Sequence, residues 1–312
     1  MPYDSLVSRT DAAAMVPEQV SSLMLRNLEN QSAVLQLATR IPIARNQVRF
    51  PVLSALPVAY FVNGDTGLKQ TTEAAWDNKY LDVEELAAIV PIPEAVLDDA
   101  SFDIFGAIRP LLEQAIARAL DAAVLFGTNA PAAWPDDLVT AATAAGNTEA
   151  RGTATQANGG LAADLVNLFG DVWADGYDVT GVVANTTLRP QILNARNTQG
   201  NRYGDDLTAT MIHGAPVVYP TRGLWPSGSG SAQAVAGDWA QLVLGVRQDI
   251  TYKVLDQAVI QDASGNIVYN LAQQDMVALR VVFRAGWQVS NPINRTQPTE
   301  ADRYPFGVLL NP

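Results

Sequence analysis

The clearest pattern in the chain is a run of apolar residues at helical spacing that follows Pro110. The run ends at Gly127, a residue type that often terminates a helix. About sixteen residues from Leu111 onward would span roughly 24 Å as a helix. Because proline is tolerated only near a helix start or at a kink, we expect a short lead-in turn or a bend at Pro110. The predicted apolar stripe comprises Phe105, Ile108, Leu112, Ala115, Ile116, Ala119, Leu120, Ala123, Val124 and Phe126, with Glu113, Arg118 and Asp121 largely on other faces.

The residues before this helix favour extended structure. Segments 48–53 and 58–62 are rich in β-branched and aromatic residues and predict two strands, and the turn cluster 63–67 follows them. The return limb, 73–93, contains LDVEELAAIV, whose propensities favour a helix; we assign it as extended on the resemblance described below. An isolated two-stranded hairpin is marginal in water, so a hairpin of this length needs a partner to pack on.

The rest of the chain predicts an arm and an α/β unit. Residues 16–37 place apolar side chains near helical spacing and predict short helices on an N-terminal arm. Segment 146–160 is polar and Gly-rich and predicts a loop between two structural units. Beyond it we expect a helix over 161–177, a buried strand over 179–185, a second helix over 186–196, and strands over 215–219, 241–246 and 276–289.

Composition excludes several classes of protein. The chain has 312 residues, no cysteine and a single histidine, and 48% of its residues are hydrophobic, which suits about two globular domains. The missing cysteines exclude disulfide frameworks and thiolate chemistry. No stretch approaches the roughly 18 to 20 apolar residues that span a bilayer, and the start lacks a basic patch followed by an apolar core. We therefore expect synthesis in the cytoplasm and no membrane partner.

Charge is distributed unevenly along the chain. The net charge of −12 argues against binding nucleic acid over the whole surface. Residues 65–103 are strongly acidic, whereas the N-terminal arm and the C-terminal end lean basic through arginine. Acidic and basic segments that lie far apart in the sequence suit head-to-tail contacts between subunits. An acidic face that is exposed to solvent explains the same pattern.

Candidate chemistry is sparse. The sequence contains no phosphate-binding loop, dinucleotide fingerprint or Gly-x-Ser-x-Gly elbow. A loop or packing role is favoured for His213 over catalysis. Segment 262–266 loosely resembles a calcium loop, but its spacing fails and a hairpin turn is favoured. For the acidic pairs at 84–85 and 98–99 we favour a role as helix caps or solvent-exposed residues over general acid–base catalysis. We therefore predict no enzyme, no catalytic residue, no cofactor and no metal site.

Three segments carry a resemblance to a known family. They are residues 49–105, the helix end DAAVLFG and the segment GDWAQLVLGVRQDITYKV. Together they resemble the major capsid proteins of tailed bacteriophages with the Hong-Kong-97-type fold, and the resemblance covers nearly the whole chain. The resemblance is specific because similar segments occur in a fixed order over most of the chain, rather than because of a short motif. The implied α+β fold has an N-terminal arm over 1–46, an extended E-loop hairpin over 47–93, a peripheral domain with a long spine helix over 94–160, an axial domain over 161–271, and a return to the peripheral domain over 272–312.

The resemblance implies a structural subunit that self-assembles, as hexamers and pentamers, into the icosahedral shell around the double-stranded DNA genome of a tailed bacteriophage. Its location would be the virion, after synthesis in the bacterial cytoplasm. Implied partners are a portal protein, optionally a decoration protein, and packaged DNA by weak non-specific contact. Because no long charged, coiled extension precedes Pro17, we expect a separate scaffolding protein or none. The alternatives are an encapsulin-like nanocompartment shell and a soluble α/β ligand-binding protein or enzyme that uses residues 161–271.

The resemblance also suggests which residues meet a neighbouring subunit. In the type member an E-loop lysine forms a covalent bond with an asparagine of another subunit, and Lys69 with Asn291 or Asn294 is the corresponding candidate here. Most relatives lack this bond, and a lysine near a loop tip more often forms a salt bridge, which we favour. The predicted subunit contacts are Tyr60, Phe61, Val62, Lys69, Arg45 and Arg49.

Overall fold

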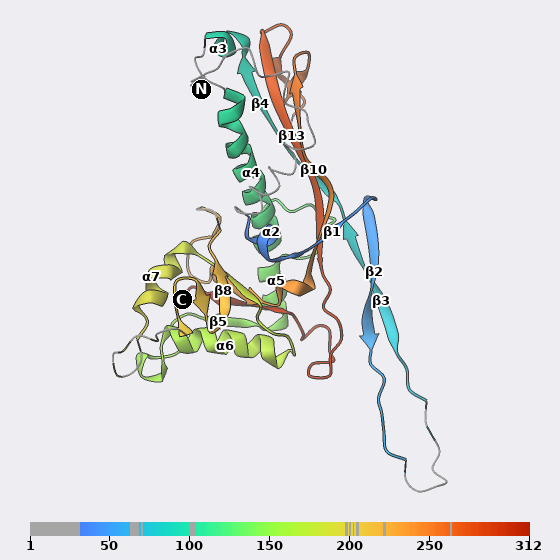
Figure 1. Cartoon of the computed structure of the whole chain (residues 1–312), viewed down its shortest axis with the longest axis vertical. Helices are drawn as coiled ribbons and strands as arrows, with labels where there is room; N and C mark the ends of the chain where they lie inside the picture. Colours follow the sequence, from blue (N-terminus) through green and yellow to red (C-terminus); the bar gives the residue numbers. More distant parts are fainter. Residues whose placement is uncertain are drawn as a thin grey trace.

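The computed structural model describes residues 32–62, 69, 71–99, 104–196, 199, 201, 203, 206–220, 223–262 and 264–312. Figure 1 shows an elongated molecule with three parts: a tall unit in which helix α4 lies beside long strands, a lower unit with a smaller sheet and several helices, and a hairpin that projects away from both. The combination of helices and sheets confirms the predicted α+β class. Within the described ranges no helix is long and apolar enough to cross a membrane.

The tall unit is built on a four-stranded sheet with the order β1-β10-β13-β4. Its central strand β13 runs antiparallel to β10 and β4, and β1 runs parallel to β10. The prediction of a strand over 276–289 is confirmed, while β10 is longer than expected. The elements of this unit are α2 (Ala33–Leu37), β1 (Thr39–Pro42), β4 (Glu84–Pro93), α3 (Glu94–Asp99), α4 (Ile104–Phe126), β10 (Leu242–Leu255), β11 (Val259–Gln261), β12 (Ile267–Asn270) and β13 (Met276–Val289).

Helix α4 covers one face of this sheet and differs from its prediction in length. It has 23 residues and begins before Pro110, which lies inside it, so neither a separate lead-in turn nor a start at Leu111 is correct. Proline lacks the N–H group, so α4 loses one intrahelical hydrogen bond at this position. Leu120 and Val124 are fully buried in the main core, together with residues of β10 and β13.

The predicted apolar stripe of α4 is partly wrong. Ala115 and Ala119, which were assigned to it, are exposed, whereas Glu113 and Asp121, which were assigned elsewhere, are buried. The reason is that α4 contacts the sheet on one side and the N-terminus of α2 on another, and Asp121 binds that N-terminus. Hydrophobic periodicity alone cannot reveal such a polar contact.

The lower unit contains a six-stranded sheet with the order β5-β14-β9-β6-β8-β7. Strand β6 is completely buried, and helix α6 packs Leu165, Leu168 and Phe169 into the core beside it. The predicted strand over 179–185 and helix over 161–177 are thus confirmed, whereas the second helix divides into a short 3₁₀ turn and α7. The elements are α5 (Leu138–Ala145), β5 (Thr148–Ala150), α6 (Leu161–Ala174), β6 (Gly181–Ala184), α7 (Arg189–Asn194), β7 (Met211–Ile212), β8 (Ala215–Val218), β9 (Ala232–Gly237) and β14 (Phe306–Leu310).

Strand pairing divides the chain differently from the predicted residue ranges. Strand β10 lies within the range expected for the axial domain, but it pairs with β13 and β1 in the long sheet. Strand β14 lies within the range expected for the peripheral domain, but it pairs with β9 and β5 in the six-stranded sheet. Both strands meet partners that are distant in sequence, so an apolar pattern does not reveal which sheet they join.

The root of the projecting hairpin sits on two glycines of the long sheet. Gly245 and Gly286 are directly paired across β10 and β13. A Cβ atom on Gly286 would overlap the carbonyl oxygen of Asp82, and one on Gly245 would overlap the side chain of Ile43. The fully buried side chain of Leu81 lies against both positions. The glycine pair therefore allows the chain to cross directly over the sheet where it enters and leaves the hairpin.

We predict that Gly286→Ala destabilises the unassembled subunit by about 1–3 kcal/mol, because a backbone atom must move to accommodate the methyl group. Gly170→Ala is the matched control, since a Cβ at this helical position would meet nothing within 4 Å. That substitution should raise the free energy of unfolding by up to about 1 kcal/mol. Urea unfolding of both variants checks this, and equal stabilities would contradict the close contact at the hairpin root.

Candidate subunit-contact surface

The projecting hairpin is formed by β2 (Gln47–Ala55) and β3 (Ala75–Asp82), which pair in antiparallel register. This confirms the predicted hairpin and the extended assignment of its return limb, whose second half is β4 of the long sheet. The predicted strand over 58–62 is wrong: the segment carries no strand pairing, because β2 ends at Ala55 and Pro57 has no N–H to donate. The turn cluster 63–67 lies outside the described residues.

One face of the hairpin is fastened to the C-terminal part of the chain. The Nζ atom of Lys79 lies 2.9 Å from a carboxylate oxygen of Glu300. Backbone contacts add to this, since the amide of Ile293 donates to the carbonyl of Leu53 at 3.0 Å and the guanidinium of Arg295 donates to the carbonyl of Pro57 at 2.6 Å. These contacts hold the paired strands, from Lys79 to the far end of β2, in a defined direction.

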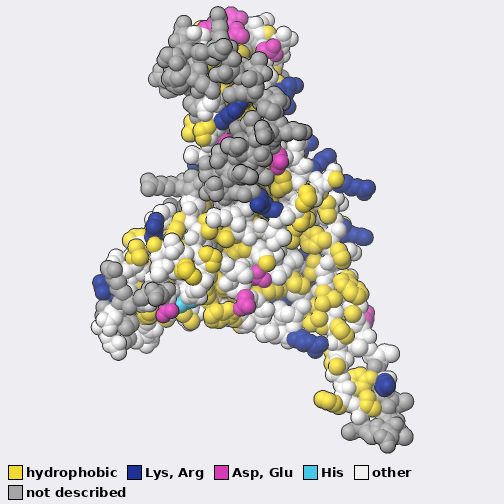
Figure 2. Space-filling model, viewed as in Figure 1, with side chains coloured by type: hydrophobic (Ala, Val, Ile, Leu, Met, Phe, Trp, Pro, Cys, Tyr) yellow, Lys and Arg dark blue, Asp and Glu magenta, His cyan; other side chains and the backbone are white. Residues whose placement is uncertain are grey.

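The opposite face carries large apolar side chains that are exposed to solvent. Trp76 lies directly opposite Leu53, and Tyr80 lies directly opposite Arg49. The exposed fractions are 63% for Trp76, 48% for Tyr80 and 104% for Phe61 beyond the paired strands. Figure 2 shows apolar side chains gathered along this projection. An exposed apolar patch that includes aromatic residues is typical of a surface that another protein covers.

The predicted contact residues lie on or next to this surface. Tyr60, Phe61, Val62 and Lys69 are all exposed near the far end of the hairpin, and Arg45 and Arg49 are exposed at its root and on β2. Sequence reasoning missed Trp76 and Tyr80. The alternation along β3, in which these two side chains share one face, could have identified them.

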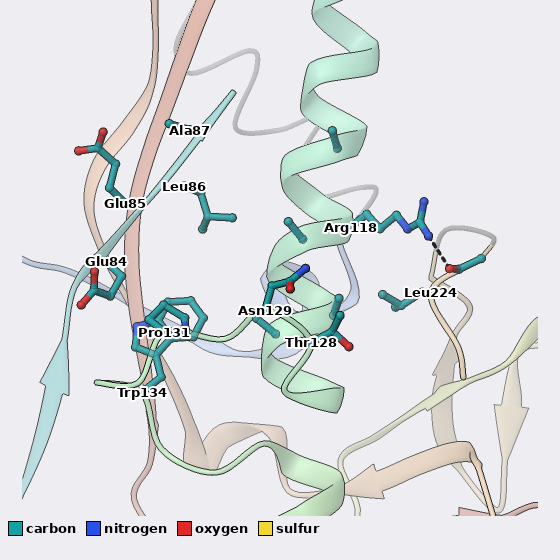
Figure 3. Close-up of a pocket in the computed structure, with 15 residues that line it drawn as sticks. Glu84, Glu85, Leu86, Ala87, Arg118, Thr128, Asn129, Pro131, Trp134 and Leu224 are labelled. Carbon is teal, nitrogen blue, oxygen red and sulfur yellow. Dashed lines mark hydrogen bonds between the residues drawn. The ribbon is translucent and has the colours of Figure 1, made fainter. Parts of the chain in front are cut away.

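A groove of about 710 Å³ lies beside α4 and forms a second part of the candidate surface. Figure 3 shows α4 on one side of it, β4 on the other, and Trp134 below. On α4 the small side chains of Ala115, Ala119 and Ala122 line the groove together with Arg118, and Leu86 contributes from β4 beside two glutamates. Arg118 donates to the carbonyl of Gly223 at 2.8 Å, as the dashed line in Figure 3 marks. Small side chains leave room for another chain to approach the helix closely.

A buried carboxylate anchors the start of α2 to α4. The side chain of Asp121 accepts hydrogen bonds from the Ser32 hydroxyl at 2.6 Å and from the amides of Ala33 and Val34 at 2.9 and 3.2 Å. Burial raises the pKa of Asp121 to about 6, and these three hydrogen bonds oppose the increase. Of the predicted arm helices only α2 lies among the described residues, and this contact fixes its position.

Both asparagines that were considered for a covalent bond have structural roles within the subunit. The side-chain oxygen of Asn291 accepts from the Tyr177 hydroxyl at 2.9 Å and from Nε of Arg303 at 3.1 Å. The side chain of Asn294 donates to the carbonyl of Asp175 at 2.6 Å and accepts from two backbone amides that follow it. These contacts use the amide groups that a covalent bond to lysine would modify.

The residues considered for catalysis or metal binding occupy structural positions. His213 lies in the turn between β7 and β8, with its ring 5.9 Å from that of Phe169. The predicted hairpin turn at 262–266 is confirmed, because β11 and β12 pair and Asp262 accepts from the amide of Asn266 at 2.9 Å. Glu85 pairs with Arg284 across β4 and β13. Over the described part of the chain, no three His, Cys, Asp or Glu side chains are placed to hold a metal.

Comparisons with known proteins identify relatives along almost the whole chain. The model of the phage capsid family matches residues 12–294. The major capsid protein of Staphylococcus phage 80alpha is 23% identical over 292 residues, which cover 92% of this chain and 86% of that protein. A chain in a solved structure of Microbacterium phage Oxtober96 is 35% identical with a TM-score of 0.80, covering 98% of this chain and 96% of that one. A chain from Mycobacterium phage Adephagia is 32% identical with a TM-score of 0.79, covering 99% of both chains.

The raised pKa of Asp121 predicts a defined pH dependence. Because the folded chain binds this proton more tightly than the unfolded chain, the contribution of Asp121 to stability is greatest below pH 4 and falls as the pH rises through 6. Relative to Asp121→Asn, the wild-type chain should lose about 2 kcal/mol of unfolding free energy between pH 4 and pH 7. Chemical unfolding at both pH values measures this difference.

Asp262→Asn is a control for which the pH dependence of stability should have the opposite sign. Hydrogen bonds, chiefly from Asn266, lower the pKa of Asp262, so its contribution is lost as the pH falls. A pH-independent difference between wild type and Asp121→Asn would contradict the buried-carboxylate assignment.

Proposed function

The chain belongs to the phage capsid family and is a major capsid protein that forms the shell, and from this premise we propose how its subunits join. Each subunit lays its projecting hairpin over the spine helix and peripheral domain of a neighbour. The comparisons favour this phage shell protein over the nanocompartment and the α/β ligand-binding alternatives.

The observation that carries the proposal is an aromatic surface held rigidly in solvent. Trp76 and Tyr80 are exposed on β3, and the paired strands are fixed to the body through Lys79 and Ile293, while Phe61 is exposed on the segment that follows β2. Burying a large apolar side chain stabilises by about 1.5–3 kcal/mol. Because the hairpin is already ordered, little conformational entropy is lost when a neighbour covers it, and more of this free energy remains for association.

The groove beside α4 is the proposed acceptor. Figure 1 shows β2 and β3 running away from α4, so these strands do not reach the groove of their own subunit. A hairpin from another copy can bring its apolar side chains against Ala115, Ala119 and Leu86. Repetition of this head-to-tail contact joins subunits without using the same surface twice.

The domains of the family are proposed to follow the sheets. The long sheet with α4 as the spine helix forms the peripheral domain, and the six-stranded sheet with α5, α6 and α7 forms the axial domain. On this assignment β4 and β10 belong to the peripheral domain and β14 belongs to the axial domain. The arm precedes β2, and the E-loop consists of β2, β3 and the segment between them.

The remaining partners follow from the resemblance. Self-association into a shell is supported by the family, and hexamers and pentamers are the proposed units. Portal, scaffolding and decoration proteins are proposed partners, and packaged DNA is proposed to make weak contacts because the chain is acidic overall. The virion is the supported location, and synthesis in the bacterial cytoplasm is part of the proposal.

Variants of the hairpin test the joining mechanism. Phe61→Ser, Trp76→Ser and Tyr80→Ser in one chain, or deletion of residues 63–72, should leave folded, soluble subunits or capsomers but abolish closed shells. Val254→Ser is the matched control, because Val254 is 42% exposed on β10 and lies outside the hairpin. Electron microscopy and sedimentation count the shells; normal shells from both hairpin variants would refute the mechanism.

A second pair of variants locates the acceptor. Ala119→Trp fills the groove and should prevent closure, whereas Thr251→Trp places the same bulk on the other face of the long sheet and should not. Unfolding transitions of the unassembled chains establish that both variants fold. If Thr251→Trp blocks closure and Ala119→Trp does not, the acceptor is the sheet face and the groove is excluded.

Covalent bonding between subunits is not proposed, because Asn291 and Asn294 are engaged within the subunit. Denaturing electrophoresis of assembled shells should therefore show one band at the monomer mass of about 33.3 kDa. Discrete higher bands that disappear in Lys69→Ala would establish the bond and contradict this expectation.

A further inference from the structure

Trp134 belongs both to the groove beside α4 and to the root of the hairpin. Its side chain is buried and lines the groove. Figure 3 shows this side chain at the lower end of the groove. Its indole N–H donates to the carbonyl oxygen of Asp82 at 3.2 Å, where β3 ends and the chain leaves the hairpin. One side chain therefore contacts both the surface that is proposed to receive a hairpin and the segment that directs one.

The carbonyl group of Asp82 lies at the point that sets the direction of the hairpin. It packs against Gly286, in the space that a Cβ atom on this glycine would fill. The next residue, Val83, closes the hairpin, because its amide donates to the carbonyl of Asn46 at 2.8 Å. The side chain of Gln47 donates to the carboxylate of Asp82 at 2.7 Å. A displacement of the Asp82 carbonyl would therefore change the direction in which β2 and β3 leave the long sheet.

The segment that joins α4 to α5 holds Trp134 in a fixed position. It begins at Gly127, whose φ is 64°, and the carboxylate of Asp137 packs where a Cβ atom on this glycine would lie. The side chain of Asp137 also caps the N-terminus of α5. The ring of Trp134 lies edge-on to that of Trp287 on β13, with the ring centroids 6.4 Å apart. Trp134 is thus fixed between the start of α5 and the long sheet before a neighbour binds.

The strand that leaves the hairpin is also a wall of the groove. Residues 84–86 of β4 follow closely after Asp82 and line the groove. Thr128 and Pro131 line it from the segment that carries Trp134. The hydrogen bond between Trp134 and Asp82 joins these two walls. The groove and the hairpin root are therefore parts of one connected structure.

We propose that Trp134 is a positioning residue that fixes the angle between the hairpin that a subunit provides and the groove in which it receives one. In a head-to-tail lattice every subunit uses both surfaces, so this angle is repeated at each contact and sets the curvature of the shell. The inference rests on the proposed joining mechanism and adds the residue that controls its geometry.

Hydrogen exchange of unassembled, full-length chains tests the contact itself. Trp134→Phe keeps an aromatic ring but removes the indole N–H, so the Val83 amide should exchange about fivefold faster, the effect of losing one hydrogen bond. Trp239→Phe is the matched control. The buried indole of Trp239 donates to the carbonyl of Gly181 on β6 at 3.0 Å, and its ring lies edge-on to that of Phe306. This control should leave the exchange of Val83 unchanged.

Two results of this measurement would overturn the proposal. One is that Val83 exchanges equally fast in wild type and in Trp134→Phe. The other is that Trp134→Phe and Trp239→Phe accelerate the exchange of Val83 equally, because the effect would then reflect a general loss of stability.

The geometry of assembled shells tests the consequence. Trp134→Phe leaves the aromatic residues of the hairpin and the alanines of the groove in place, so subunits should still join. Electron microscopy should show a wider distribution of shell diameters than in wild type, or open and spiral particles, because the angle between hairpin and groove is no longer fixed. Trp239→Phe should give wild-type diameters. A wild-type distribution from Trp134→Phe, or an equal spread from both variants, would contradict the positioning role.

An isosteric replacement provides the same test if Trp134→Phe does not fold. The amino acid 3-benzothienylalanine at position 134 replaces the N–H group by sulfur and keeps the shape of the ring. Unassembled chains should again show faster exchange of Val83, and shells should again show the wider distribution of diameters. Wild-type behaviour in both measurements would contradict the proposal.

The two proposals can fail separately, because the exchange measurement does not depend on how subunits join. If the three hairpin substitutions leave shells normal while Trp134→Phe accelerates the exchange of Val83, the joining mechanism fails and the root contact stands. If the hairpin substitutions abolish closure while Trp134→Phe exchanges and assembles like wild type, the positioning role of Trp134 fails and the joining mechanism stands.

Discussion

The structure depends on one close contact, where the root of the hairpin crosses the long sheet at Gly245 and Gly286. The missing side chains allow Leu81 to be fully buried there, and the chain can leave the sheet, form the hairpin and return as β4. A flexible loop could carry the same aromatic residues, but ordering it on association would cost conformational entropy. A fixed root transfers that cost from assembly to the folding of the subunit.

The same division between folding and assembly is visible elsewhere. Asp121 fixes the start of α2 against α4 through three hydrogen bonds, although burial of the carboxylate opposes its ionisation. A buried carboxylate of this kind fixes where α2 begins but adds little to the stability of the fold. The free energy gained from its hydrogen bonds is largely offset by the cost of removing the charge from water. Exposed apolar residues on the hairpin, Phe61, Trp76 and Tyr80, are the ones that we propose identical copies bury. Each subunit is thus well ordered but incompletely buried.

Much of this architecture could be predicted from the sequence, and the failures have physical causes. The long strand over 276–289, helix α6 and the buried strand β6 follow from periodicity, because each buries a regular set of side chains. The extended return limb of the hairpin did not follow from propensity, which favours a helix there; pairing with β2 and β13 overrides it. Sheet membership of β10 and β14 was also hidden, since it depends on partners that are distant in sequence. For the contact surface, the tip residues were identified, but Trp76 and Tyr80 were not, because their exposure depends on which face of β3 meets the segment near Ile293.

Hydrogen exchange of the free subunit and of the assembled shell, followed over residues 47–82, tests the central claim most directly. The account predicts that the amides near Leu81 at the hairpin root are protected in both states. Amides beyond the paired strands, over 58–62 and 71–74, should be protected only in the shell, where a neighbour covers them. Equal protection of these tip segments in the free subunit and in the shell would contradict the claim that the hairpin is completed by another copy.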